Sequence, residues 1–193
     1  MKILTAKVVF CIGFLMASSA QAYSSYSSSD GATYRFGWSG IRVDHTTNYN
    51  GQTSTDVQTN HINTKFSYTF SNGIYLGALY EFSSFAIGTG TPPPDQRISY
   101  GPTLGFYNSG FYIEGTYFTN STYTFANGLS YSGGSASQFE IGYLMNMTSN
   151  FYLGFGLTMA NFSWNQAATG GISVSQTNNQ SDTYPCLNLG FSF

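Results

Sequence analysis

The chain has 193 residues, of which only 7% are charged and 18% are aromatic, and its formal net charge is −2. A soluble domain carries about 25% charged residues, so this chain has too little charge to cover a water-facing globule of its size. The scarcity of basic residues also excludes a nucleic-acid-binding surface. Low charge, many aromatic residues and no long apolar segment beyond the N-terminus are together typical of a transmembrane β-barrel.

Residues 1–22 have the parts of a secretory signal peptide: two lysines, an apolar stretch too short to span a bilayer, and a small-residue cleavage site ending at Ala22. We therefore expect cleavage after Ala22. A short serine-rich leader over residues 23–31 and a barrel domain over residues 32–193 are expected to follow.

Eight runs of alternating apolar and polar residues follow the leader, and a period of two is the pattern of a strand with two different faces. In the last run, apolar residues occupy every second position up to the terminal Phe193. The expected strands are Thr33–Asp44, His61–Phe70, Ile74–Ser84, Arg97–Phe106, Phe111–Phe118, Ser137–Met145, Phe151–Ala160 and Tyr184–Phe193.

Short and long connections alternate between these runs. Tight turns are expected at Ser71–Gly73, Asn108–Gly110 and Met147–Asn150. Long polar loops are expected at Thr46–Val57, Phe85–Gln96, Asn120–Gly134 and Asn165–Asp182. The pattern predicts an all-β fold, an eight-stranded antiparallel up-and-down transmembrane barrel whose termini are periplasmic and whose long loops are extracellular. The barrel must close, because an open sheet edge in lipid leaves backbone groups unpaired.

Three places depart from regular alternation. The phase changes at Gly40, which predicts a β-bulge there. Pro102 has no N–H group for a ladder hydrogen bond, so we expect a bulge or local defect near it. Over Asn161–Trp164 the phase is lost, and the sequence does not assign the faces of these residues.

Seven charged residues lie on the polar faces of their runs. They are Arg35, Arg42, Lys65, Glu81, Arg97, Glu114 and Glu140. An Arg or Lys that faces lipid at mid-bilayer costs about 2–4 kcal/mol, so we expect these side chains to point inward and to pair with one another. Eight strands leave an interior only wide enough to be filled by side chains, so the network is expected to plug the barrel. A gated polar path through it is the alternative.

The turn length at Ser71–Gly73 predicts which charges meet. It places Lys65 opposite Leu79 and diagonal to Glu81, within reach of an ion pair. The two carboxylates on neighbouring later strands, Glu114 and Glu140, are expected to share Arg35 or Lys65.

The sequence offers no catalytic, metal or cofactor site, so the chain is expected not to be an enzyme. Cys186 is expected to be a small buried residue on the inward face of the last strand. The histidines and the acids near the outer loops are expected to be solvated polar residues: His45, His61, Asp44, Asp56, Asp95 and Asp182.

The signal peptide, the strand rhythm and the ending Leu187–Phe193 together resemble the small eight-stranded outer-membrane β-barrel proteins of Gram-negative bacteria, the OmpA-barrel, OmpX and OmpW group. The resemblance covers residues 32–193. It implies that Phe191 and Phe193 belong to the C-terminal signal recognised by the barrel-assembly machinery. It also implies an outer-membrane location among lipid and lipopolysaccharide. The lipid A deacylase branch is not supported, because no histidine is followed two residues later by serine.

These observations lead us to expect a structural or surface-interaction role, in which the four extracellular loops contact lipopolysaccharide or other cell surfaces, as in a surface antigen. A narrow porin-like channel for small or apolar solutes, which the OmpW resemblance implies, is the first alternative. A lipid-modifying enzyme is the second. A soluble lipocalin-like barrel would need a charged outside, and this chain is too poor in charge to supply one.

Overall fold

The computed structural model describes residues 33–49, 52–87 and 94–193, and the side chains at 41–49, 52–59 and 86–87 lie outside the description. The expected signal peptide and leader also lie outside the described residues. The strands in these ranges are β1 Thr33–Tyr49, β2 Gln52–Thr69, β3 Ile74–Ile87, β4 Asp95–Asn108, β5 Phe111–Phe118, β6 Asn120–Thr124, β7 Ser130–Ser132, β8 Ser135–Asn146, β9 Phe151–Thr169 and β10 Ile172–Ser192.

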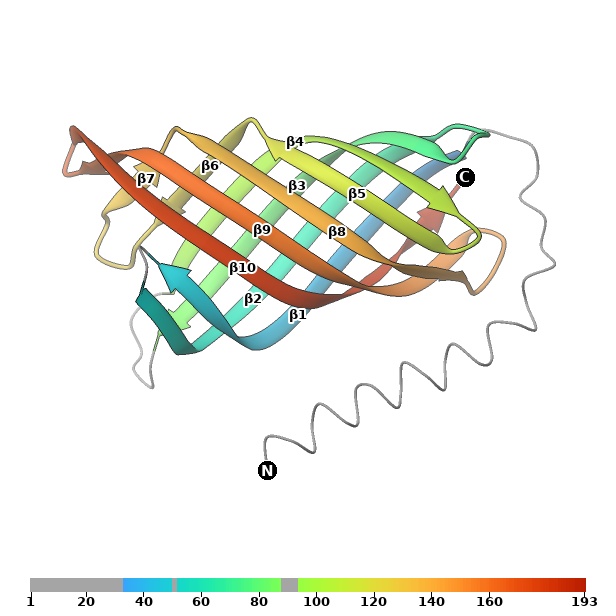
Figure 1. Ribbon diagram of the computed structural model, residues 1–193, viewed down its shortest axis with the longest axis horizontal. Coiled ribbons are helices and arrows are strands. Elements are labelled where there is room, and N and C mark those ends of the chain that lie inside the picture. Colours follow the sequence, from blue (N-terminus) through green and yellow to red (C-terminus); the bar gives the residue numbers. More distant parts are fainter. Residues whose placement is uncertain (1–32, 50–51, 88–93) are drawn as a thin grey trace, which may run out of the picture. The chain divides into compact units, whose positions relative to one another are not determined.

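The strands close into a ring of eight, which confirms the predicted barrel (Figure 1). Each of β1, β2, β3, β4, β5, β8, β9 and β10 pairs antiparallel with the next, and β10 pairs back onto β1. Strand β6 continues β5 along β4, and the short β7 lies between β6 and β9. No helix in the described ranges has the length and hydropathy needed to cross a bilayer.

The predicted tight turns are all present at one end of the barrel, where the C-terminus also lies (Figure 1). Between β4 and β5 the turn consists of Ser109 and Gly110, with φ of 49° and 93°. Two residues with positive φ form the kind of turn that matches the twist of a β-hairpin. These short connections set the pairing register, including the predicted match of Lys65 with Leu79.

The long connections are mostly strand, so three of the loop predictions are wrong. Strand pairing fills most of Thr46–Val57, a β6–β7 hairpin occupies Asn120–Gly134, and β9 and β10 pair as far as Thr169 and Ile172. The fourth expected loop, Phe85–Gln96, is strand at both ends, and residues 88–93 lie outside the described part. These segments were predicted to be loops because they are polar. Strands that extend beyond lipid can also be polar, since their outer face does not require apolar residues.

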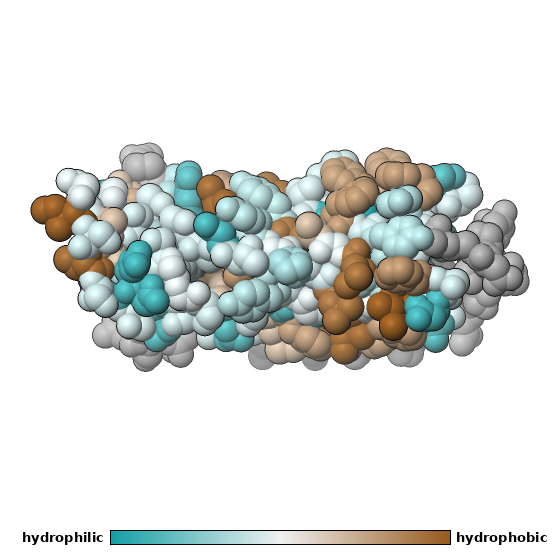
Figure 2. All heavy atoms as spheres, turned by 90° about the horizontal axis from the view of Figure 1, so that it is seen from above, coloured by the Kyte–Doolittle hydropathy of each residue, from teal (hydrophilic) through white to brown (hydrophobic). Residues whose placement is uncertain are grey.

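An apolar belt covers the half of the barrel toward the short turns, and Figure 2 shows its hydrophobic colour gathered there. Leu76 is 52% exposed and Phe66 is 49% exposed on this outer surface, while Glu81 and Arg97 inside are 0% exposed. The belt consists of Tyr34, Trp38, Ile62, Phe66, Phe70, Ile74, Leu76, Tyr80, Ile98, Tyr100, Leu104, Phe106, Phe111, Tyr117, Phe139, Phe155, Leu157, Met159, Leu187, Leu189, Phe191 and Phe193. This is the inverse of a soluble protein, as predicted.

Beyond the belt the polarity of the wall reverses. We call this part the head; it comprises residues 41–49, 52–61, 83–87, 94–97, 118–138 and 160–184. Its interior holds an apolar cluster of Phe85, Phe118, Tyr123, Tyr131, Ala136, Ala160, Phe162, Trp164 and Ala167, joined from below by Leu79. Buried polar side chains, among them Asp95, Asn178 and Gln180, lie inside the head as well. The residues Asn161–Trp164, which the sequence left unassigned, keep the period, with Phe162 and Trp164 buried inside.

The predicted defect near Pro102 is present, on the neighbouring strand. Strand β4 pairs with β5 up to Thr103–Thr116 and with β6 from Tyr100–Asn120, so two residues of β4 face three residues of the neighbouring segment. This β-bulge passes close to Gly101, where a Cβ atom would lie 2.8 Å from the Cα atom of Phe118. A glycine is therefore required beside the proline.

The predicted bulge at Gly40 is present on one side only. Pairing of β1 with β2 runs through Gly40 without a shift, whereas pairing with β10 stops at Gly40 and resumes, out of register, at Asn48. On the β2 edge of β1 the register shifts farther along, between His45 and Thr47.

Candidate functional site

The candidate site is the barrel interior, where inward positions of alternate strands carry the polar and charged side chains. Two clusters occupy it. The upper cluster lies at the base of the head, where it meets the belt, and contains His61, Glu81, Ser83, Arg97 and Asp182. The lower cluster lies toward the short turns and contains Lys65, Tyr75, Tyr112, Glu114, Glu140 and Asn188.

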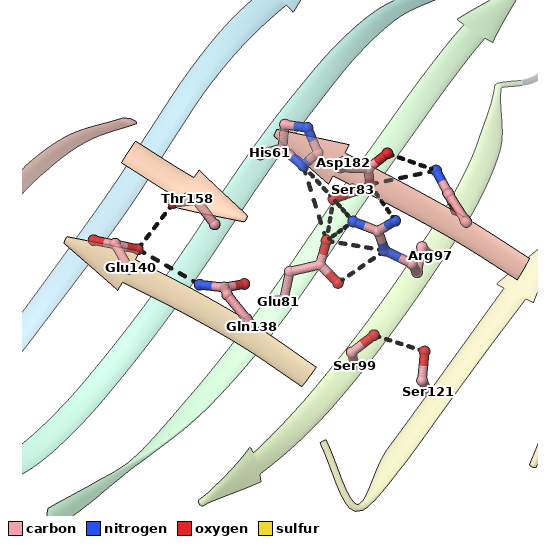
Figure 3. A network of polar contacts seen from close by, with 11 residues as sticks. His61, Glu81, Ser83, Arg97, Ser99, Ser121, Gln138, Glu140, Thr158 and Asp182 are labelled. Carbon is pink, nitrogen blue, oxygen red and sulfur yellow. Dashed lines mark hydrogen bonds and ion pairs between the residues drawn. The ribbon is translucent and has the colours of Figure 1, made fainter. Parts of the chain in front are cut away.

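Arg97 is the centre of the upper cluster, between two carboxylates from opposite sides of the ring (Figure 3). Its Nη2 donates to Glu81 Oε1 at 2.8 Å, and its Nη1 donates to Asp182 Oδ2 at 2.6 Å. Ser83 also donates to Glu81, and its Oγ lies 2.7 Å from His61 Nδ1. One arginine thereby joins β4 to β3 and, across the barrel, to β10.

Aromatic rings enclose this charged group. The guanidinium carbon of Arg97 lies 3.7 Å from the centre of the Phe162 ring and 5.2 Å from that of Phe85. The His61 ring stacks on Tyr184 at 3.8 Å, with the planes within 5°. A cation over an aromatic face gains electrostatic stabilisation that is larger where water is excluded. The upper cluster is therefore continuous with the apolar interior of the head.

In the lower cluster each carboxylate has its own set of donors. Lys65 Nζ and the Tyr75 hydroxyl each lie 2.5 Å from Glu114 Oε2. Glu140 accepts from the Tyr112 hydroxyl at 2.5 Å, from Thr158 at 3.1 Å and from Asn188 at 3.2 Å. Buried carboxylates need such donors, because an unpaired buried charge is strongly destabilising.

These pairings differ from the expected ones in two respects. Lys65 lies opposite Leu79 and pairs with Glu114, one of the two carboxylates expected to share Arg35 or Lys65. The diagonal Glu81, which was also expected within its reach, pairs with Arg97 instead. Glu140 is held by hydroxyl and amide donors, and Lys65 and Glu114 pair without it. The diagonal rule describes neighbours within a sheet, whereas in a closed barrel facing strands also lie within side-chain reach.

Of the remaining predicted residues, Arg35 places its guanidinium carbon 3.8 Å from the centre of the Tyr107 ring. Arg42 pairs through its backbone with Asn60 on β2, and its side chain lies outside the described part. Phe191 is on the outer surface with its ring 5.5 Å from that of Phe151. The backbone of Phe193 exchanges two hydrogen bonds with Tyr34, at 2.9 and 3.0 Å, which ties the end of the chain to its first strand.

Tyrosines fill the lower interior where glycines leave room for them. A Cβ atom at Gly156 would lie 2.5 Å from the Tyr112 hydroxyl, and one at Gly142 would lie 2.6 Å from it. The cavity that Arg35, Lys65, Glu114 and other residues line has a volume of about 20 Å³, enough for one water molecule. The second Glu114 oxygen, Oε1, is buried without a hydrogen-bond partner.

Sequence reasoning missed three members of the interior. We expected His61, Asp95 and Asp182 to be solvated, but they are 1%, 8% and 2% exposed. The signal was present for Asp182, because the buried positions of β10 continue in steps of two from Cys186 through Tyr184 and Asp182 to Gln180. Cys186 itself is buried, as predicted. His45, Asp44 and Asp56 lie where side chains are not described.

Ser83, His61 and Glu81 do not have the order of a nucleophile, a base and an acid, because the Ser83 hydroxyl contacts both His61 Nδ1 and Glu81 and so lies between the other two. Ser83 and Glu81 are 0% exposed, and the head closes the space above them. Among the described residues, no group of three His, Cys, Asp or Glu side chains is placed to hold a metal ion. The interior chemistry is thus that of mutual charge neutralisation inside the wall.

No protein-family model and no curated protein matches the chain. Among solved structures, it is similar to Ail, the attachment invasion locus protein of Yersinia pestis, in complex with the heparin analogue sucrose octasulfate: 12% identity, 84% of this chain and 97% of that one covered, TM-score 0.48. It is also similar to the outer membrane protein OprG from Pseudomonas aeruginosa, with 12% identity, 84% of this chain and 96% of that one covered, and a TM-score of 0.43. For the toluene transporter TodX from Pseudomonas putida the identity is 10%, the coverage is 86% of this chain and 75% of that one, and the TM-score is 0.24.

The ring of eight antiparallel strands is the fold of the small outer-membrane β-barrel proteins that the sequence resembles.

Proposed function

We propose that this chain is an integral protein of a bacterial outer membrane, and that it acts as a structural or surface-interaction barrel rather than as a channel or an enzyme. The observation that carries the proposal is the combination of an apolar outer belt with a filled interior. The belt accounts for the membrane location. Because side chains fill the interior, the outer surface is the part of the molecule that can interact with other molecules.

Energetics support the location. Water would have to cover the exposed side chains of the belt, among them Leu104 at 58% and Leu187 at 54%, if the barrel were soluble. Exposed apolar patches larger than a few hundred Å² are rare on soluble monomers. Acyl chains remove this cost, and ring closure leaves no unpaired strand edge within the lipid. The termini then lie on the periplasmic side and the head outside the cell.

The packing of the interior supports a barrel that is closed to the passage of solutes. Three successive levels occupy it: the lower cluster with its tyrosines, the upper cluster around Arg97, and the apolar interior of the head. Arg97, Glu81 and Trp164 are each 0% exposed, and the cavity beside Glu114 holds no more than about one water. A solute would have to displace both ion-paired clusters and the aromatic head in order to pass.

The length of the head supports a surface role. Strand β10 continues beyond the belt from Ile172 to Tyr184, which at ordinary strand rise and barrel tilt corresponds to roughly 30 Å outside the lipid. We propose that this rigid, strand-built head contacts lipopolysaccharide and the surfaces of other cells. The barrel-assembly machinery is its proposed partner during insertion, with Phe191 and Phe193 as part of the signal.

Two measurements test the proposal. Heat-modifiable gel mobility in the outer-membrane fraction is expected, and planar bilayers containing the purified barrel are expected to show no steady conductance. As a matched comparison, conductance is also measured for two variants. Trp164→Ala removes one filling side chain from the head, and Tyr112→Ala removes one from the lower interior. A steady conductance of the unaltered protein that is lost on Glu81→Ala or Arg35→Ala would instead establish the channel.

A further inference from the structure

An apolar groove lies on the outer surface of the barrel at the short-turn end, where the first and last strands meet. Its volume of about 430 Å³ is within the range of ligand-binding sites in proteins. On β1, Phe36 pairs with Phe66 of β2 and with Phe191 of β10, so three phenylalanines form one row across the join. We call this site the seam groove; it is lined by Phe36, Phe66, Phe191, Phe193, Asn150 and Ser192.

Each phenylalanine ring of the seam groove packs against another aromatic ring, so its walls are held in place. The ring pairs are Phe36 with Trp38, Phe191 with Phe151, Phe66 with Tyr34, and Phe193 with Tyr34, with centroids 4.5 to 6.3 Å apart. These distances are in the range at which aromatic rings attract one another. The groove is therefore preformed, and binding a ligand costs little free energy for ordering its walls.

The end of the seam groove at the turn between β8 and β9 is polar. The side-chain amide of Asn150 donates to the backbone carbonyl of Ser192 at 3.0 Å. Beside it, the Ser149 hydroxyl donates to the Asn150 side chain at 2.6 Å, and the Thr148 hydroxyl accepts from two backbone N–H groups of the turn. An apolar groove that ends at hydroxyl and amide groups matches the polarity of a lipid, in which a hydrocarbon chain is joined to polar ester groups.

We propose that the seam groove binds one acyl chain of a phospholipid in the periplasmic leaflet, with the ester groups of that lipid beside the turn at Met147–Asn150. This inference rests on the proposed function, because a belt seated in acyl chains with its short turns toward the periplasm places the groove in that leaflet. Lipopolysaccharide, which the head is proposed to contact, lies in the opposite leaflet.

The rival occupant within this chain is the leader over residues 23–31. It precedes the first strand, and Tyr34 near the start of that strand is hydrogen-bonded to Phe193 beside the groove. The leader has five serines and one aspartate, however, and these side chains are better solvated by water than by phenylalanine rings. The apolar lining therefore favours the acyl chain.

The expected preference is modest, because acyl chains surround the whole belt in any case. Entry into the groove brings closer packing against rigid rings and no further hydrophobic gain. Hydrogen bonds between the ester groups and the polar end add to this packing. We expect the groove to prefer a phospholipid about tenfold over an amine-oxide detergent, which has no ester group.

Trp38 reports on the groove, because its ring packs against that of Phe36 at 4.5 Å. The chain has only one other tryptophan, Trp164, which is buried in the head and supplies a constant background. The full chain, folded in amine-oxide micelles, is titrated with a phospholipid whose acyl chains carry bromine, a contact quencher of tryptophan fluorescence. Quenching is expected to saturate at a single lipid per barrel, at about one tenth of the lipid fraction that random mixing would require.

A matched pair of variants locates the contact. Phe66→Ala removes one wall of the groove and is expected to weaken the saturable binding about fivefold. Phe106→Ala makes the same change at an exposed position of the belt that does not line the groove, and is expected to leave binding unchanged. Heat-modifiable mobility reports that each variant is folded.

Three outcomes would overturn the inference while leaving the barrel in its membrane: quenching that rises without saturation, absence of quenching because the leader fills the groove, or equal effects of the two variants. Failure of the unaltered chain to insert into bilayers would instead overturn the proposed function. A separate insertion assay in lipid vesicles distinguishes the two failures.

Discussion

The belt and the head are built from the same strands with opposite polarity. On β9, the inward positions Gly154, Gly156 and Thr158 of the belt are small or polar, and their outward neighbours Phe155 and Leu157 are exposed. Farther along the same strand, the inward positions are Phe162 and Trp164 and the outward ones are Asn161 and Asn165. One strand thus passes from an inside-out arrangement to that of a soluble protein.

The difference follows from the solvent that each part meets. In the belt, lipid accepts the apolar residues, so the interior is free to hold ion pairs that stabilise one another. In the head, water accepts the polar residues, and apolar burial again supplies the stability. The Arg97 cluster lies where the two regimes meet, with carboxylates on one side and the rings of Phe162 and Phe85 on the other.

The largest expected effect is at this junction. Arg97→Met leaves Glu81 and Asp182 as buried carboxylates without their cation, so we expect a loss of about 3–5 kcal/mol in the free energy of unfolding. Urea titration of the barrel in lipid vesicles, followed by tryptophan fluorescence, measures it. The triple variant Glu81→Gln, Arg97→Met, Asp182→Asn removes all three charges and is expected to recover most of the loss; a triple as unstable as the single would contradict the account.

The next largest expected difference is between the cost of truncating a large side chain in the head and the cost of truncating one in the belt. Trp164→Ala leaves a cavity in the head and is expected to cost about 3–5 kcal/mol, with proteolytic cleavage of the head appearing first. Leu189→Ala removes a side chain that faces lipid, where an acyl chain refills the space, so we expect under about 2 kcal/mol. Limited proteolysis and urea titration measure both. Equal costs for the two would show that the head is not packed as a soluble core.

The reverse comparison introduces a charge on the outside. Leu104→Lys places an ammonium in the belt and is expected to cost about 2–4 kcal/mol, because lipid cannot solvate it. Gln96→Lys makes the same addition on the same strand in the head, where water solvates it, and is expected to change stability by about 0.5 kcal/mol or less. Vesicle unfolding titrations of the two variants give the difference, and a tolerated lysine at 104 would place that position outside the lipid.

The smallest effect concerns the bulge that both regions share. Gly101→Ala forces a Cβ atom against the backbone of Phe118 and is expected to cost about 1–3 kcal/mol. Pro102→Ala keeps the bulge and removes only the ring, so we expect about 1 kcal/mol or less. The order of the two costs, read from the same titrations, checks that close approach at Gly101 is what shapes the wall there.

Much of the barrel follows from the sequence alone. Period-two alternation locates all eight wall strands and assigns inward and outward faces within the belt, because lipid penalises every exposed charge there. Tight turns with glycine or asparagine then set the register, as with Lys65 and Leu79. Outside the belt this penalty disappears, so the alternation weakens and strands such as Ile172–Tyr184 look like polar loops.

The sequence by itself determined which residues face inward in the belt, since that choice depends only on neighbours along one strand and on the solvent outside. Only the tertiary structure decided which inward residues meet. Arg97 and Asp182 are 85 positions apart and come together because the sheet closes into a ring. The partners of Lys65 and Glu140, and the burial of His61, have the same cause: closure brings facing strands within reach of one another, and no pattern along a single strand contains that distance.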